Sequence, residues 1–90
     1  MSASTTSAEL PGTVLVYGRV DCADTQRTRA LLERLAVPAE FLDVESDAAL
    51  AQEAARLGGG PRVPVVRFPD GTVEVEPSDE LVLDRLGLER

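Results

Sequence analysis

Cysteine, histidine and tryptophan are scarce or missing in this sequence of 90 residues, in which Cys22 is the only cysteine. Without histidine the chain holds no His-based catalytic triad, and one cysteine cannot form a Cys/His zinc site, so we expect no metal. A single cysteine also excludes a disulfide within the chain. A reducing, cytoplasmic setting is therefore expected.

Positive charge is scarce as well. Nine arginines and no lysine stand against 16 acidic residues, which gives a net charge of −7. An acidic surface repels phosphate backbones, so nucleic acid is not an expected partner. No apolar run approaches the roughly 20 residues that span a bilayer, and residues 1–10 lack the features of a signal peptide. We expect a cytoplasmic monomer with no membrane partner.

The apolar content, 43 % of residues, is that of an ordinary globular domain. Residues 1–11 are rich in Ser, Thr and Ala and have little to bury, which predicts a flexible N-terminal tail. Residues 12–90 are then expected to form a single domain.

Apolar runs separated by Gly and Pro predict alternating strands and helices in this domain. The expected elements are a strand over 13–17, a helix over 23–35, a strand over 39–44, a helix over 47–57, strands over 64–68 and 72–75, and a helix over 78–86. The nearly continuous apolarity of residues 13–17 is typical of a central strand covered on both faces. Ser46 or Asp47 caps the second helix, and Ser78 opens the last one.

The order β-α-β-α-β-β-α predicts an α/β fold. A strand–helix–strand unit forms a right-handed parallel pair. The hairpin around Pro69-Asp70-Gly71 must then join that sheet in the antiparallel direction. The result is a four-stranded mixed sheet with helices on both faces, which is the thioredoxin-like arrangement.

Cys22 is the residue best suited to chemistry, because it follows a predicted buried strand and directly precedes a helix. Unpaired N–H groups at a helix N-terminus favour the reactive thiolate and lower a cysteine pKa from about 8.5 to about 3.5–7.5. Arg19 on the same loop acts in that direction, whereas Asp21 and Asp24 raise the pKa. The alternative is a buried, inert cysteine.

The loop before this helix and three later segments together resemble the glutaredoxin family. The segments are Tyr17-Gly18-Arg19-Val20-Asp21-Cys22, Arg62-Val63-Pro64-Val65-Val66, Asp70-Gly71 and Pro77-Ser78-Asp79. The similarity extends over about Thr13 to Leu86. It looks closest to small actinobacterial glutaredoxin-like proteins, the mycoredoxin type among them.

The resemblance implies roles for three residues near the predicted helix start. Cys22 matches the family's nucleophilic cysteine. Val63 and Pro64 match a valine and a cis-proline whose backbone lies beside the sulfur and pairs with the thiol substrate. Sequence alone predicts a trans bond there, because only about 5–6 % of X-Pro bonds in folded proteins are cis.

Three polar residues match further family positions. Arg19 stands where many members have a lysine that stabilises the thiolate and a glutathione carboxylate; the alternative is a solvated loop charge. Ser78 and Asp79 stand where the family's last helix begins and binds the low-molecular-weight thiol. Plain N-capping of that helix is the alternative for both residues.

The chain departs from the family's dithiol motif, since Thr25 stands in the place of the second cysteine. Without a second thiol, no group within the chain can release Cys22 from a mixed disulfide. Thr25 either donates a hydrogen bond to the thiolate or is only an early helix residue. Glu76-Pro77 replaces a glycine pair that is common in glutathione-binding members, and the signature of cluster-carrying monothiol members is absent.

The leading hypothesis is a monothiol oxidoreductase that reduces mixed disulfides between proteins and a low-molecular-weight thiol through Cys22. The small thiol, mycothiol or glutathione, is a co-substrate, and no bound cofactor is expected. The expected partners are this thiol and thiol-modified proteins. Two alternatives are a degenerate domain that only binds a partner, and an iron–sulfur carrier whose cluster is held by Cys22 of two chains and two small thiols.

Overall fold

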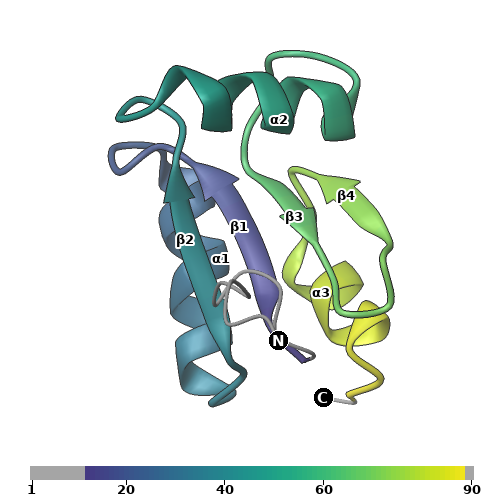
Figure 1. Ribbon diagram of the computed structural model, residues 1–90. Helices are drawn as coiled ribbons and strands as arrows, with labels where there is room; N and C mark the ends of the chain where they lie inside the picture. Colours follow the sequence, from purple (N-terminus) through teal and green to yellow (C-terminus); the bar gives the residue numbers. More distant parts are fainter. Residues whose placement is uncertain (1–11, 89–90) are drawn as a thin grey trace, which may run out of the picture.

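The computed structural model describes residues 12–88, which form one four-stranded sheet and three helices (Figure 1). The elements are β1 (Val14–Gly18), α1 (Ala23–Arg34), β2 (Ala39–Asp43), α2 (Ala48–Gly58), β3 (Val65–Arg67), β4 (Val73–Val75) and α3 (Asp79–Arg85). Each bound lies within one residue of the expected one, and the predicted order of elements is confirmed. The tail expected over residues 1–11 lies outside the described residues.

The sheet has the order β2-β1-β3-β4, so β1 lies in its interior and pairs on both sides. β1 runs parallel to β2, whereas β3 is antiparallel to β1 and β4 to β3. In the turn between β3 and β4, the Asp70 carboxylate accepts hydrogen bonds from the backbone N–H and the hydroxyl of Thr72, at 2.9 and 2.8 Å. The predicted mixed sheet and its hairpin are confirmed.

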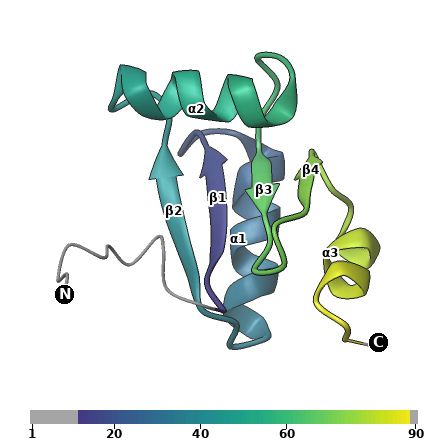
Figure 2. The same ribbon diagram turned by 45° about the vertical axis from the view of Figure 1, so that its right-hand side comes forward.

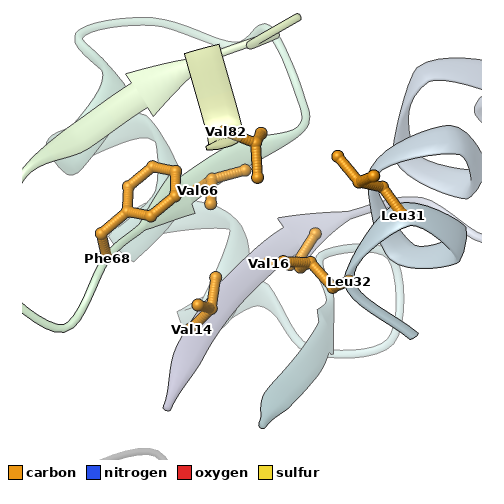
Figure 3. Packing of buried hydrophobic residues seen from close by; sticks show 7 residues of the cluster. All are labelled: Val14, Val16, Leu31, Leu32, Val66, Phe68 and Val82. Carbon is orange, nitrogen blue, oxygen red and sulfur yellow. The ribbon is translucent and has the colours of Figure 1, made fainter. Parts of the chain in front are cut away.

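One face of the sheet packs against α1 and α3. The buried side chains of this layer, drawn in Figure 3, are Val14, Val16, Leu31, Leu32, Val66, Phe68 and Val82. Fully burying an aliphatic or aromatic side chain contributes about 1.5–3 kcal/mol, so this layer fixes α1 firmly against the sheet.

The other face is covered by α2, which crosses the end of the sheet toward which β1 and β2 run (Figures 1 and 2). Leu15, Tyr17, Ala54 and Val65 form the buried cluster on this side. Helices therefore cover both faces, as predicted. All five residues of β1 are buried, so the loop that follows Gly18 starts from a fixed point.

Short-range polar contacts set the start of two helices. Asp47 caps α2 by accepting a hydrogen bond from the backbone N–H of Ala49 at 2.8 Å, which decides between the two expected caps. Ser78 caps α3 by accepting one from Leu81 N–H at 3.1 Å. A left-handed Gly59, with φ of 77°, ends α2.

Candidate functional site

Cys22 is the N-cap of α1, directly after the loop that follows β1. Its backbone N–H donates to the carbonyl of Arg19 at 3.2 Å, and its carbonyl accepts from the N–H of Gln26 at 2.9 Å. The residue is partly exposed. Cys22 is therefore not buried as the alternative interpretation held, and its reactivity stays a prediction.

The surroundings of Cys22 lower the pKa of its thiol below the usual value. Hydrogen bonding from the Thr25 hydroxyl is the largest cause, followed by the Thr25 backbone N–H; burial opposes them, and the Asp24 N–H and the charge of Arg19 contribute less. Hydrogen bonds to the charged form favour that form, so the helix start favours thiolate. The carboxylates of Asp21 and Asp24, which were expected to raise the pKa of Cys22, do not reverse this lowering.

Thr25 lies in the first turn of α1 and is wholly buried. Its hydroxyl is near enough to Cys22 to lower the pKa of the thiol, although it makes no hydrogen bond of ordinary geometry with the described residues. Gly18 makes room for this side chain, since a Cβ at residue 18 would lie 2.5 Å from the Thr25 hydroxyl oxygen. The lowered pKa of Cys22 is in the direction that a hydrogen-bond donor at Thr25 would give, and this role of Thr25 stays a prediction.

The Arg19 side chain forms ion pairs with two carboxylates. Its Nε lies 3.6 Å from Asp21 and 3.9 Å from Glu45. Glu45 comes close because β1 and β2 pair in parallel, which places the loops after Gly18 and Asp43 side by side. The guanidinium is thus neither a free thiolate partner nor a simple solvated charge, and its effect on the pKa of Cys22 is small.

The peptide bond between Val63 and Pro64 is cis, as the resemblance implied and as sequence statistics did not. Tyr17 pairs with Val65 across β1 and β3, so the register continued by one residue sets Pro64 opposite Gly18. The carbonyl of Pro64 accepts a hydrogen bond from the backbone N–H of Glu76 at 2.8 Å. The cis-proline therefore links the start of the Cys22 loop to the segment that leads into α3.

An open groove of about 510 Å³ lies between the N-terminal ends of α1 and α3. Its lining residues are Asp24, Arg27, Glu76, Ser78, Asp79 and Glu80. The two expected small-thiol residues, Ser78 and Asp79, thus face the groove together with the first turn of the helix that Cys22 caps. The Ser78 hydroxyl is engaged in capping α3, as the alternative interpretation held.

Arg27, which was not among the site residues expected from the sequence, joins the two sides of this groove. Its guanidinium donates to Asp24 at 2.7 Å, to Asp79 at 3.3 Å and to the backbone carbonyl of Pro77 at 3.0 Å. The spacing of Asp24 and Arg27 on one helix was visible in the sequence. The contacts with Asp79 and Pro77 were not, because they depend on how α3 packs beside α1.

Within residues 12–88, no group of three or more His, Cys, Asp or Glu side chains is arranged to hold a metal ion. None of the helices described is long and apolar enough to cross a membrane.

Residues 14–73 match the model of one protein family, described as Glutaredoxin. The search of curated proteins found no match. Among solved structures, the glutaredoxin (grx-1) from Archaeoglobus fulgidus superposes with a TM-score of 0.77 at 21 % identity, over 89 % of this chain and 90 % of that one.

A second similar fold is that of the thioredoxin-like protein BC3987. Its crystal structure gives a TM-score of 0.73 at 25 % identity, over 80 % of this chain and 97 % of that one. A point mutant of the same protein gives 0.76 at 24 % identity, over 84 % and 96 %. These likenesses agree with the thioredoxin-like fold predicted from the order of elements.

Proposed function

The chain belongs to the glutaredoxin family, and from that membership we propose that it is a monothiol thiol–disulfide oxidoreductase. Its substrates are mixed disulfides between proteins and a low-molecular-weight thiol, mycothiol or glutathione. The observation that carries the proposal is the only cysteine of a glutaredoxin-family chain, partly exposed at a helix N-terminus where its surroundings lower its pKa. The domain of residues 12–90 supplies the whole site in this proposal.

The first step is an exchange of one disulfide for another. The Cys22 thiolate attacks the sulfur of the small thiol in the mixed disulfide, and a bond forms between these two sulfurs. The sulfur–sulfur bond to the substrate protein breaks, and that protein leaves as a thiolate that takes a proton from water. One disulfide is consumed and one is made, so no external oxidant or reductant enters the step.

The second step restores Cys22. A second molecule of the small thiol, as thiolate, attacks the small thiol's sulfur in the mixed disulfide with Cys22. The symmetric small-molecule disulfide leaves, and Cys22 returns to the thiolate that its surroundings favour. This step needs an outside thiol because the chain has no second cysteine.

The remaining predicted residues take supporting roles in this proposal. Thr25 stabilises the Cys22 thiolate as the attacking and the leaving sulfur, and Arg19 adds a smaller electrostatic contribution. The backbone of Val63 and Pro64 pairs with the small thiol. These roles fit the cis bond and the lowered pKa of Cys22, both of which support the proposal.

Ser78 and Asp79 are proposed to contact the body of the small thiol from the N-terminal end of α3. Both residues line the groove that starts at the first turn of α1. The role proposed for Ser78 uses its backbone, since its hydroxyl caps the helix.

The rate of Cys22 alkylation by iodoacetamide, measured against pH, tests whether the sulfur is active. We expect the midpoint for the folded protein to lie below that of the unfolded chain, near 8.5, because the thiolate is the alkylated form. Turnover of protein mixed disulfides with mycothiol or glutathione should then be lost in Cys22→Ser. A folded midpoint at or above the unfolded one, or full turnover in the variant, refutes the proposal.

A domain that only binds partners is the main competing function. That hypothesis rested on the aspartates near Cys22, which disfavour the thiolate, and on the missing second cysteine. The lowered pKa of Cys22 counts against it.

A further inference from the structure

We propose that Gln26 is a positioning residue, whose side chain holds the turn before α1 and so keeps the Cys22 sulfur over the helix start. This role rests on the proposed function, because it concerns how the same sulfur is prepared for attack on a mixed disulfide. Gln26 acts through the backbone of the turn rather than on the sulfur itself.

The start of α1 differs from the starts of the other two helices. α2 and α3 are capped by Asp47 and Ser78, whose side-chain oxygens accept hydrogen bonds from backbone N–H groups of the first turn. The N-cap of α1 is Cys22, and its side chain makes no cap hydrogen bond of ordinary geometry. A neutral thiol is a weak acceptor. The helix end that carries the sulfur therefore lacks the usual protection against fraying.

The turn of residues 19–21, which leads into α1, is held only weakly by its own contacts. Val20 is 56 % exposed, so packing does little to fix it. The ion pair between Arg19 and Asp21, at 3.6 Å, lies within the turn, and exposed pairs of this kind contribute little to stability. The Cys22 N–H donates to the Arg19 carbonyl at 3.2 Å, which closes the turn on itself. A fixed orientation of the turn requires a contact with the helix.

Gln26, at the start of the second turn of α1, supplies this contact. Its side-chain amide donates a hydrogen bond to the backbone carbonyl of Val20 at 2.8 Å, six residues back along the chain. Its backbone N–H donates to the Cys22 carbonyl at 2.9 Å. One residue thus binds both the turn and the N-cap. The side-chain bond breaks if the turn swings away or the first helical turn unwinds, so it opposes both movements.

The conformation of the helix start decides which groups face the sulfur. The donors of Thr25 and the Asp24 N–H lower the pKa of Cys22 in a conformation where the N-cap backbone is extended, with φ of −89° and ψ of 123°, and residues 23–25 are helical. When the helix start opens, these donors turn away and the thiol returns toward its pKa in the unfolded chain. The Gln26 bond therefore increases the fraction of molecules in which the thiolate is favoured.

Gln26→Met tests this role, because methionine has a similar length and helix propensity but no donor. The net contribution of one hydrogen bond corresponds to roughly a two- to tenfold change in a local equilibrium. Since this bond is exposed, we expect the thiolate fraction of Cys22 below its midpoint to fall about threefold, measured by iodoacetamide alkylation against pH. Gln52→Met is the matched control on α2 and should keep the wild-type profile, because Gln52 is an exposed residue of another helix.

Gln26→Arg is the rescue variant. The Nε–H of arginine lies as many bonds from Cα as the amide nitrogen of glutamine, so it can donate to the Val20 carbonyl. Its positive charge would by itself favour the thiolate, so the variants are also compared in about 1 M salt, where the Debye length is about 3 Å. We expect Gln26→Arg to restore the wild-type alkylation profile there. Amide hydrogen exchange at Cys22 should be faster in Gln26→Met than in the wild type or Gln26→Arg.

The outcomes separate this role from the function on which it rests. An unchanged alkylation profile in Gln26→Met, an equal loss in Gln52→Met, or a loss that Gln26→Arg does not restore would overturn the role of Gln26. The proposed function survives each of these results if the midpoint of wild-type Cys22 lies below that of the unfolded chain. A wild-type midpoint at or above the unfolded one refutes the proposed function and the role of Gln26 together.

Discussion

Replacing Thr25 by valine should reduce the thiolate fraction of Cys22 while the fold stays intact. The substitution keeps the shape of the side chain and removes the hydroxyl that contributes most to the low pKa of Cys22. The variant also removes a buried hydroxyl without an ordinary hydrogen-bond partner. We therefore expect stability at low pH to be unchanged or higher by about 1 kcal/mol.

The expected magnitude follows from the kind of bond that is lost. A hydrogen bond to a charged group contributes about 1.5–3 kcal/mol, and the lower value applies here because Cys22 is partly exposed. About 1.4 kcal/mol corresponds to a factor of ten, so the thiolate fraction below the midpoint should fall about tenfold. The remaining thiolate is a better nucleophile, which limits the loss in disulfide-exchange rate to about threefold.

The assay compares Thr25→Val with Thr28→Val, a matched control one turn further along α1. Both threonines are wholly buried and both hydroxyls lack an ordinary partner among the described residues, but only Thr25 contributes to the pKa of Cys22. Ultraviolet absorbance of the thiolate and the rate with a neutral disulfide are followed against pH. An unchanged thiolate fraction in folded Thr25→Val, or an equal loss in Thr28→Val, would refute the reasoning.

The same contact predicts how stability depends on pH. The pKa of Cys22 is lower in the folded protein than in the unfolded chain, so the stabilising contribution is fully present above the unfolded pKa, about 8.5. It is lost as the pH falls through the folded pKa. Urea denaturation across this range should show the free energy of unfolding rising with pH, and Thr25→Val should flatten that rise while Thr28→Val should not.

Three further substitutions test the frame around the site. Gly18→Ala should cost about 1–3 kcal/mol in urea denaturation and slow alkylation of Cys22, because its Cβ would overlap the Thr25 side chain; a normal alkylation profile would contradict this contact. Asp47→Ala removes the cap of α2 and should cost about 1 kcal/mol, with the alkylation rate unchanged. Phe68→Ala should cost about 3–5 kcal/mol, since the ring is 2 % exposed in the core; a loss below about 1 kcal/mol would speak against that packing.

Most of the fold could be predicted because the sequence marks its own boundaries. Pro11-Gly12 and Gly18 enclose an unbroken apolar run, and Gly58-Gly59-Gly60-Pro61 stops a helix that could not continue through it. The cis bond before Pro64 is different, since the trans form is the ordinary expectation and only the family resemblance pointed the other way.

From the residues alone, without the family resemblance, the candidate site could be predicted only where its contacts are local. Cys22 and Thr25 lie three residues apart on one helix, so their contact follows from helical geometry. The bridge from Arg27 to Asp79 joins residues 52 positions apart, and the contact of Arg19 with Glu45 requires the parallel pairing of β1 and β2. Neither contact has a signal in the sequence, because side-chain partners across elements are decided by packing.

The central position of β1 has a consequence for how the site moves. β1 is hydrogen-bonded on both sides and wholly buried, so its amides should exchange with solvent only when the whole domain unfolds. α3 has seven residues and follows the edge strand β4, so we expect it to open locally at a lower cost in free energy. We expect such fluctuations to reshape the wall of the groove that α3 forms, while Cys22 and Thr25 stay in place at the start of α1.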